Sequence, residues 1–425
     1  MKKLKTGKKL YSVIGAFILC TILIAMIVCS SKSVPKVKAS NLMDGVKSHQ
    51  VNVKTPDDAF INSVTDFSLT LFNKTRSNNG NSLISPLSVM IALSMTANGS
   101  DHETLNQMNS VLSKDIPLEQ LNQYLHTYIN HLPENKKTKV TIANSIWYRD
   151  DKDLKINPNF LQTNADYYQS SIYKSPFNNQ TKNDINNWVK GKTDRVIDKI
   201  IDNIGNNDVM YLINTVLFDA RWDTIYEKKD IDDMTFHNQD GTTANVPGMH
   251  SGERFYIEDD MATGMMKSYY NDDYRFLALL PREGISLDDY LKQLTADQLL
   301  QAVKNALSDG VSVTIPKFKY EYDITMNDSL KELGMTDAFS MDKADFSKMG
   351  KSSQGNIYID SILHKTYISV DAKGTKAGAV TKIEMATKSA PFEERTVILD
   401  RPFFYAIIDT KTKLPIFIGT VNNLQ

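Results

Sequence analysis

The sequence predicts one domain in which α-helices and β-strands are mixed, and three observations carry this prediction. Apolar residues recur at helical spacing early in the chain, and β-branched runs typical of strands alternate with helical segments from there on. From about residue 56 to the end there is no linker longer than a loop, no charge block and no fixed-period repeat. Because a chain of 425 residues can fold as one large domain or as two, the missing linker favours one.

The composition is that of an ordinary globular protein. Hydrophobic residues make up 41% and charged residues 23% of the chain, which excludes a largely disordered or collagen-like protein. With a net charge of -1, the protein has no overall positive charge that would attract nucleic acid, so nucleic acid is not expected as a partner. Lysine outnumbers arginine, and Asn, Ile and Asp are abundant, a bias that suggests an AT-rich bacterial genome.

The first part of the chain predicts export. Residues 10–29 carry no charge and are long enough to span a bilayer, and they follow five lysines: Lys2, Lys3, Lys5, Lys8 and Lys9. The small residues Val37 and Ala39 resemble a signal-peptidase site that would be cut after Ala39. Residues 1–39 are therefore expected to be a cleaved export signal or a retained membrane anchor, and residues 40–55 a tether.

Both cysteines of the chain, Cys20 and Cys29, lie in this apolar run. A lipid attached to Cys29 is a third interpretation, although Val28 stands where such sites need a small residue. In each case the protein is expected to be extracellular, secreted or anchored to the outer face of the cell membrane, with membrane contact only through the N-terminal segment. The rest of the chain lacks thiols, which excludes disulfides, thiol catalysis and cysteine metal sites.

Two helices are the clearest elements. Residues 59–74 carry apolar side chains mostly every three to four positions, as an amphipathic helix requires: Phe60, Val64, Phe67, Leu71 and Phe72. Residues 86–97 are apolar nearly all round, which predicts a buried helix. Ser85 is expected to be its N-cap, with Pro86 at the first helical position, where a missing N–H costs nothing.

Strand signals are intermingled with helical ones along the rest of the chain. Their long β-branched runs predict large sheets covered on at least one face. The segments are 141–147, 209–218, 274–280, 311–318, 357–370 and 402–407.

An exported enzyme is not supported by the motifs. Ser-x-x-Lys, the nucleophile motif of penicillin-binding proteins, occurs at Ser33, Ser171 and Ser340, but the only Lys-Thr-Gly lies at residues 5–7, and Gly-x-Ser-x-Gly is absent. The seven histidines include no His-x-x-x-His pair. We expect no catalytic residues, no metal site and no cofactor.

A series of short motifs resembles the serpin family in residue type, spacing and order. The first is Asn81-Ser-Leu-Ile-Ser85-Pro86-Leu-Ser88. Later ones are Asn144-Ser-Ile-Trp147, Asn186-Asn-Trp188, Asn214-Thr-Val-Leu-Phe218 with Trp222, Ile315-Pro-Lys-Phe318, Leu333-Gly-Met335, Asp345-Phe-Ser347, His364-Lys365, Asp400-Arg-Pro-Phe403 and Phe417-Ile-Gly419. They keep the family order from residue 81 to residue 419.

The resemblance implies an α+β serpin fold, with three β-sheets, eight or nine helices and an exposed reactive-centre loop near residues 372–399, on a monomeric domain over residues 56–425. It also implies an inhibitory member that acts on serine proteases. Together with the N-terminal segment and the composition, this predicts an exported bacterial serpin whose targets are extracellular. Three departures affect loop geometry: His102 replaces a usual glycine, residues 194–195 replace Gly-Lys, and residues 219–220 replace Lys-Gly.

The sequence of the predicted hinge, at the start of the reactive-centre loop, has the pattern of a strand with one buried face. It resembles the family's hinge over Lys373, Gly374, Thr375, Lys376, Ala377, Gly378, Ala379, Val380 and Thr381. Counted from Thr375, alternate positions are small or apolar as far as Met385. A segment whose sequence is compatible with both a strand and a loop suits a conformational switch.

Counting from the hinge glycine, the resemblance places the scissile bond at Lys388-Ser389. A lysine there favours trypsin-like proteases, because a desolvated ammonium needs a carboxylate in the primary pocket. Met385 and Thr387 leave elastase- or subtilisin-like proteases open. Cleavage would form an acyl-enzyme, and insertion of the hinge into the main sheet would then distort the protease before it deacylates.

The resemblance also implies a region where the main sheet opens, formed by Ser85, Ser88, Asn214, His364 and Lys365. The alternative for these residues is that they are polar core residues satisfied by hydrogen bonds. For the protein as a whole, the alternative is a non-inhibitory serpin that serves as a binding or chaperone module.

Overall fold

The computed structural model describes residues 36–133, 135–151, 153–353, 355–375 and 395–425. Residues Lys38–Gln425 form one compact unit. Within the described residues no helix is both long and apolar enough to cross a membrane. Residues 376–394 lie outside the described part of the chain, and with them the predicted scissile bond and the predicted hinge from residue 376 onward.

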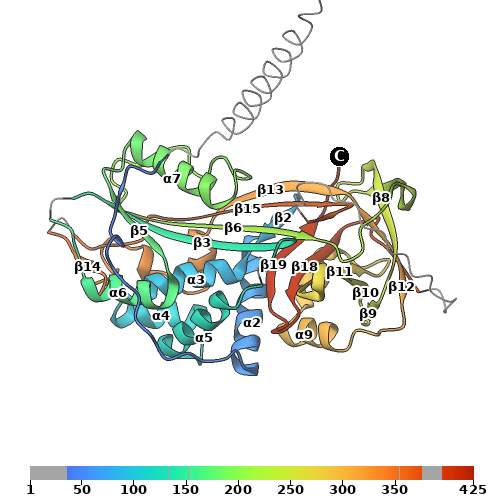
Figure 1. The fold of residues 1–425 in the computed structure, drawn as a ribbon, viewed down its shortest axis with the longest axis horizontal. Coiled ribbons are helices and arrows are strands. Elements are labelled where there is room, and N and C mark those ends of the chain that lie inside the picture. The colour runs from blue at the N-terminus through green and yellow to red at the C-terminus, as the bar shows by residue number, and fades with distance from the viewer. Residues whose placement is uncertain (1–35, 134, 152, 354, 376–394) are drawn as a thin grey trace, which may run out of the picture. The chain divides into compact units, whose positions relative to one another are not determined.

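A seven-stranded sheet dominates the architecture and forms the upper layer of Figure 1. Its strands run in the order β1, β5, β3, β6, β16, β15 and β13. Their bounds are Ser40–Asn41, Ser171–Ser175, Thr138–Arg149, Met210–Arg221, Gly374–Thr375, Ser361–Asp371 and Phe318–Thr325.

Two further large sheets and one small one complete the strands. The six-stranded sheet has the order β2 (Ser82–Ile84), β19 (Pro415–Val421), β18 (Phe403–Asp409), β11 (Tyr274–Pro281), β10 (Ala262–Ser268) and β9 (Phe255–Glu258). The four-stranded sheet has the order β17 (Thr396–Ile398), β12 (Val311–Pro316), β8 (Thr243–Glu253) and β7 (Ile231–His237). A two-stranded sheet pairs β14 (Gly350–Lys351) with β4 (Lys155–Ile156).

Nine α-helices lie in the described residues, which agrees with the expected eight or nine. They are α2 (Asp58–Thr75), α3 (Pro86–Ala97), α4 (His102–Leu112), α5 (Leu118–Asn130), α6 (Pro158–Tyr168), α7 (Asn179–Lys192), α8 (Leu287–Gln293), α9 (Ala296–Lys304) and α10 (Asn327–Glu332). In Figure 1, α3 to α6 lie on one side of the seven-stranded sheet and α7 on the other.

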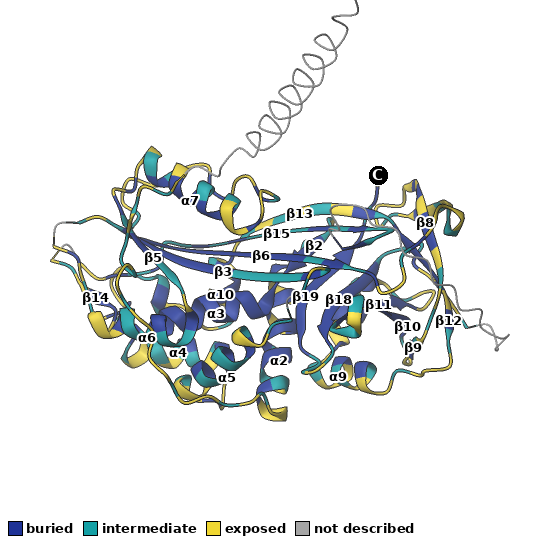
Figure 2. Ribbon diagram, in the orientation of Figure 1, coloured by how far each residue is buried: buried dark blue, intermediate teal, exposed yellow. Residues whose placement is uncertain are grey.

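The core lies between the seven-stranded sheet and the elements beneath it. Every residue of α3 is buried, and Figure 2 shows dark, buried residues along α3 and the inner strands. The helix contacts β19 of the six-stranded sheet as well as β3 and β6. An all-round apolar helix is stable there because neighbours cover each of its faces.

The two helices expected from periodicity are confirmed as α2 and α3, and Pro86 is at the start of α3 as predicted. Ser85 occupies the N-cap position, but its hydroxyl makes no capping bond. Instead, Ser85 Oγ is a buried side-chain atom without a hydrogen-bond partner among the described residues, and the backbone N–H of Ser85 is used elsewhere. The capping role expected for this side chain is wrong.

The strand segments are confirmed with shifted ends. The segment expected at 311–318 divides into two strands, because the chain leaves β12 at Lys317 and crosses to β13. The backbone N–H of Lys317 donates to Pro247 O at 2.8 Å. The segment expected at 357–370 begins as a strand only at Ser361.

Residues 38–49 lie along the domain. Lys38 N donates to Asp184 at 3.0 Å, β1 pairs antiparallel with β5 at the edge of the seven-stranded sheet, and His49 N donates to Asp166 at 2.6 Å. Backbone groups at an edge strand need partners, and this segment supplies them for part of β5.

Candidate functional site

The short strand β16 marks the candidate site. Gly374 and Thr375 lie between β6 and β15 and pair antiparallel with both: Thr375 is opposite Ala220 on one side and Val370 on the other. The chain therefore leaves β15, turns at Ala372 and Lys373, and re-enters the same sheet as a new strand after only two residues of turn.

Beyond the end of β16, the flanking strands β6 and β15 are not paired with one another for several residues. They pair directly, in parallel, only where Ser361–Lys365 of β15 meets Tyr211–Thr215 of β6 (residues 361–365 and 211–215). Among the described residues, no backbone pairing joins residues 366–369 to residues 216–219 across the sheet. We call this unpaired stretch the slot. It has the direction of a missing strand, because β16 already lies between β6 and β15 at one end of it, which we call the upper end.

Gly374 is required at the start of β16. A Cβ on this residue would lie 2.1 Å from Ala220 O and 2.8 Å from Arg221 Cα. Backbone atoms cannot move aside as a flexible side chain can, so only glycine permits this close approach.

Aromatic residues hold the turn that leads into β16. Trp222 donates its backbone N–H to Lys373 O at 2.9 Å and its indole Nε1–H to Asp371 O at 2.8 Å. Tyr226 donates its backbone N–H to Ala372 O at 2.9 Å. Three successive carbonyl groups are thus fixed from one side, which explains why the turn is ordered although it leads out of the sheet.

Thr375 is the deepest residue of β16, with 2% of its surface exposed. Its hydroxyl lies 2.5 Å from the hydroxyl of Tyr269, and the ring of Tyr269 stacks on Trp222 with centroids 4.4 Å apart. Desolvation raises the pKa of Tyr269, so its phenol stays protonated and can donate to Thr375.

A buried polar cluster joins β6, β15, β3 and α3 at the lower end of the slot. The side-chain amide of Asn214 donates to Ser88 Oγ and to Asn144 Oδ1, and its carbonyl accepts from His364 Nδ1. The backbone N–H of Ser85 donates to His364 Nε2 at 3.1 Å. Together these bonds close the sheet where β6 and β15 still touch.

The imidazole of His364 is fully buried, and burial lowers its pKa to about 3. The hydrogen bonds agree with a neutral ring, because Nε2 accepts a hydrogen bond from the backbone N–H of Ser85 and Nδ1 donates one to Asn214. A second proton on Nε2 would face the N–H of Ser85. The cluster therefore has one charge state in which every hydrogen bond is made.

Lys365 does not join this cluster. It is the neighbour of His364 on a strand, so its side chain points to the opposite face of the sheet. There it pairs with Glu321 at 3.0 Å and Asp323 at 3.5 Å, both on β13.

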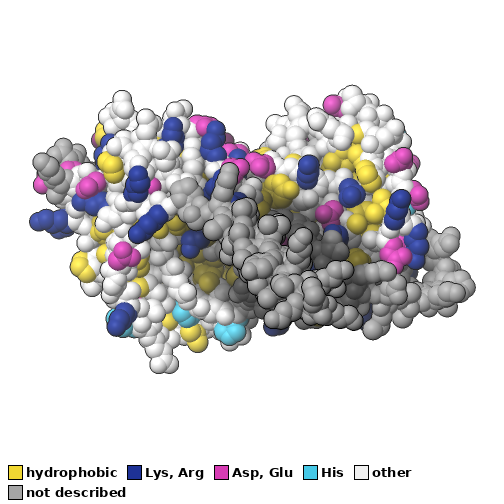
Figure 3. All heavy atoms as spheres, turned by 45° about the horizontal axis from the view of Figure 1, so that its top comes forward, with side chains coloured by type: hydrophobic (Ala, Val, Ile, Leu, Met, Phe, Trp, Pro, Cys, Tyr) yellow, Lys and Arg dark blue, Asp and Glu magenta, His cyan; other side chains and the backbone are white. Residues whose placement is uncertain are grey.

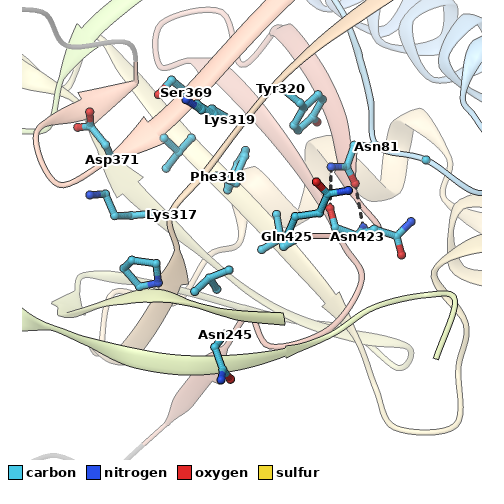
Figure 4. Close-up of a pocket in the computed structure, with 15 residues that line it drawn as sticks. Asn81, Asn245, Lys317, Phe318, Lys319, Tyr320, Ser369, Asp371, Asn423 and Gln425 are labelled. Atoms are coloured by element: carbon cyan, nitrogen blue, oxygen red, sulfur yellow. Dashed lines mark hydrogen bonds between the residues drawn. The ribbon is translucent and has the colours of Figure 1, made fainter. Parts of the chain in front are cut away.

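A pocket of about 790 Å³ opens beside the hinge turn, between the upper ends of β15 and β13, strand β8 and the C-terminal residues (Figure 4). Lys317, Lys319 and Asp371 supply its charges, and Phe318 and Val370 belong to its apolar lining. Of the strands that line this pocket, only β15 borders the slot, because β13 pairs with the outer side of β15 and β8 belongs to another sheet.

The family comparison decides the identity of this arrangement. The serpin family, described as serine protease inhibitors, matches residues 62–424 of the chain. The chain belongs to the serpin family.

Similar serpins are known as sequences and as structures. The native state of tengpin, a thermophilic serpin, is 52% identical, covers 91% of this chain and 100% of its own, and superposes with a TM-score of 0.89. The latent state of tengpin is 51% identical, with a TM-score of 0.79 over 88% of this chain and 100% of its own. An uncharacterized serpin-like protein of Thermococcus kodakarensis is 28% identical over 85% of each chain.

Of the serpin residues expected at the sheet-opening region, the structure brings together Ser85, Ser88, Asn214 and His364, and it places Lys365 apart from them. Of the expected hinge residues, Lys373, Gly374 and Thr375 are described as turn and β16. The others lie outside the described residues: Lys376, Ala377, Gly378, Ala379, Val380 and Thr381, and with them the bond Lys388-Ser389.

The sequence analysis missed four residues of the site. Asn144 and Trp222 stood in motifs that resembled serpins, but no role was assigned to them. Tyr226 and Tyr269 had no sequence signal, because nothing in their spacing connects them to a turn about a hundred or more positions later. Only the fold places them against the hinge.

Proposed function

We propose that this serpin inhibits a serine protease by inserting its cleaved loop into the slot between β6 and β15. The observation that carries the proposal is the register of β16. Pairing of Thr375 with Val370 and with Ala220 fixes how every following residue would align if the strand continued downward.

Continued in this way, the strand would place Ala377 opposite Ile368, and Thr381 opposite both His364 and Asn214, by counting from the two observed pairs. His364 and Asn214 already face each other in the present sheet. The alignment with β15 and the alignment with β6 therefore agree, because each places Thr381 beside one member of a pair that already exists. β6 and β15 would need only to part sideways, without sliding along their axes, to admit the strand.

The side chains suit this alignment. Thr375, Ala377, Ala379 and Thr381 would alternate onto the face where β15 buries Ile368, Thr366 and His364 in turn. Small residues enter a packed layer with little steric resistance. The parallel contact of β6 with β15 would be replaced by two antiparallel ladders, which are slightly more stable per residue.

We propose Lys388 as the specificity residue and a trypsin-like protease as the target, since a lysine presented on a loop suits a pocket that holds a carboxylate. The protease serine would form an acyl bond with Lys388 and release the chain at Ser389. Insertion would then carry the protease away and distort its oxyanion hole before water completes the reaction. The serpin itself would not act as a catalyst.

We propose further that the protein is exported, because an uncharged run at residues 10–29 follows a lysine-rich start. Mass determination of the protein recovered from an expressing bacterium would distinguish cleavage after Ala39 from retention or lipidation at Cys29. A full-length, unmodified protein found in the cytoplasm would contradict export.

On the face shown in Figure 3, basic and acidic side chains are interspersed, which suits a protein partner better than a polyanion.

The test is to mix residues 38–425 with trypsin and look for a complex that survives denaturing electrophoresis at the summed size of the two proteins. A control with Lys388→Gly should lose the complex with trypsin. If wild type is cleaved at residue 388 as a simple substrate, with no complex, the protein is a non-inhibitory serpin and a binding or chaperone role takes the place of this proposal.

A further inference from the structure

A buried lysine lies directly beneath the hinge turn. Lys267 on β10 has 2% of its surface exposed, and its ammonium lies 2.5 Å from the carboxylate of Glu253 on β8, whose side chain is 11% exposed. A charge this deep is stable only when it is paired, because burial without a partner is costly. The pair joins the six-stranded sheet to the four-stranded one.

The ammonium of Lys267 faces two aromatic rings. It lies 4.5 Å from the ring centroid of Tyr226 and 5.6 Å from that of Trp222. Desolvated cation–π contacts of this kind contribute more than exposed ones. On the other side, Ser251 Oγ donates to Glu253 at 2.6 Å and lies 3.1 Å from the Tyr226 hydroxyl, so the same carboxylate also positions Tyr226.

These two rings belong to the residues that hold the hinge. Trp222 and Tyr226 together donate three hydrogen bonds to the carbonyl groups of Asp371, Ala372 and Lys373. A displacement of the Trp222 ring would move the indole donor directly, and a displacement of either ring would disturb the backbone that carries the other two donors. The ion pair is therefore one contact away from the turn that aligns β16.

We propose that Lys267 and Glu253 are a positioning pair that keeps the hinge turn seated, so that loop insertion starts from an aligned strand. The role rests on the proposed inhibitory function, because it is the start of insertion that it serves.

Loss of one partner has a defined consequence. In Glu253→Gln the ammonium of Lys267 keeps its burial but loses its counter-charge, so water or a shift of β10 must compensate. The rings of Trp222 and Tyr226 then lose their fixed support and the turn opens more often. Insertion after cleavage starts later, and more acyl-enzyme is hydrolysed before the protease is trapped.

The direct readout is hydrogen exchange of the backbone amides of Trp222 and Tyr226, which donate to Lys373 and Ala372. We expect Glu253→Gln and Lys267→Met each to speed this exchange on the order of tenfold. The double variant removes both charges and keeps an unbranched apolar chain in place, so its exchange should return to within about threefold of wild type. Exchange rates in the double variant equal to the product of the single effects would overturn the proposal.

The matched control is Asp288→Asn, the same carboxylate-to-amide change in the pair that Asp288 makes with Arg76, whose side chain is 11% exposed. Arg76 follows the end of α2, and Asp288 lies on α8, where it also pairs with Lys292 at 2.6 Å. Both lie far from the hinge turn in sequence. This variant should lower the melting temperature and leave exchange at Trp222 and Tyr226 unchanged. Equal acceleration in both carboxylate variants would show that the pair is merely structural and would overturn the proposal.

The second readout is the number of serpin molecules consumed per trypsin molecule inhibited. Glu253→Gln should raise it about two- to fivefold, at an unchanged rate of loop cleavage, and the double variant should restore it. If wild type forms no complex with trypsin, the inhibitory function fails but the exchange measurement still tests the positioning pair. If wild type inhibits and the variant exchanges and inhibits as wild type does, the pair alone is refuted.

Discussion

His364 connects the charge state of one side chain to the closure of the sheet. Its ring bridges Ser85 on one side and Asn214 on the other, and the bond that Nε2 accepts from the backbone N–H of Ser85 requires the neutral form. Because the residue lies where β15 still touches β6, a proton added here acts on the strands that insertion must separate.

The first prediction concerns pH. Burial lowers the pKa of His364 from 6.5 to about 3, so below pH 6.5 the unfolded chain binds a proton that the native state refuses. The contribution of His364 to the free energy of unfolding should therefore be fully present above about pH 6.5. Below that pH it should fall by about 1.4 kcal/mol per pH unit, until the folded pKa is reached. Urea titrations at pH 7 and pH 5 should show wild type losing about 2 kcal/mol more than His364→Gln.

The control for this prediction is His131→Gln, since His131 is exposed. That variant should follow the wild-type pH dependence. Equal losses in wild type and His364→Gln between pH 7 and pH 5 would contradict the prediction.

The second prediction concerns Asp219, the acidic residue that departs from the family's usual lysine. By the register of β16, residue 376 is the next to enter the slot and would align with Asp219 on β6. Lys376 would then meet an opposite charge. We expect Asp219→Lys to raise the serpin-to-protease ratio needed for inhibition about two- to fivefold, because like charges across strands cost up to about 1 kcal/mol.

The reversed pair supplies the control for Asp219. In Asp219→Lys with Lys376→Glu, attraction returns with the signs exchanged, and the ratio should return to that of wild type. A double variant as poor as the single one would show that the charge at Asp219 does not guide insertion.

Single residues also show what the sequence could and could not predict. It flagged His102 and Asp194 as places where glycine is usual, and the structure has both at positive φ, 47° and 48°. Arg195, which replaces a usual lysine, is also at positive φ, 65°. The left-handed conformation survives the loss of glycine at some cost in strain. Lys365 was grouped with His364 from its place in one motif, although neighbours on a strand face opposite ways.

At the scale of elements, β15 and β16 could be predicted only in part. Alternation identified residues from Thr375 onward as a potential strand, but the same pattern fits an edge strand or a loop. What settles the position of Gly374 and Thr375 is the close approach to Ala220 and the support of Trp222. Both are tertiary contacts, which periodicity does not encode.

The third prediction tests β16 as the first part of the inserting strand. Thr375 is buried against Tyr269, and Thr375→Arg would force a long cation into that site. The hinge should leave the sheet, cleavage should proceed without trapping, and the serpin should behave as a substrate. The measurement is the yield of the complex with trypsin that survives denaturing electrophoresis.

The matched control is Ser369→Arg. Ser369 lies beside the slot on β15, but it is half-buried and its side chain faces the other way along the strand from Val370. This variant should keep most of the inhibitory activity. Full inhibition by Thr375→Arg would refute the assignment of β16 as the start of insertion.

At the scale of the whole molecule, the sequence predicted the fold class, the helix number and the three large sheets, because motifs in family order span nearly the whole domain. The resemblance implied that the main sheet can accept the hinge, but residue patterns alone could not locate the slot. The slot exists because β6 and β15 are each paired on their outer sides, to β3 and β13, and only partly to each other. Such a vacancy is a property of the assembled sheet and of no single segment.

The last prediction follows from that vacancy. Once the loop is cut, residues 376 to 385 can add about ten residues to β16, and at about 0.2 to 1 kcal/mol for each cross-strand pair the gain is several kcal/mol. The cleaved serpin should therefore melt well above the native one, by more than 10 °C as a rough scale for a gain of this size. Differential scanning calorimetry before and after limited cleavage with trypsin measures the shift. Thr375→Arg, cleaved in the same way, should show little of it. A cleaved wild type that melts at or below the native temperature would mean that the slot does not accept the strand.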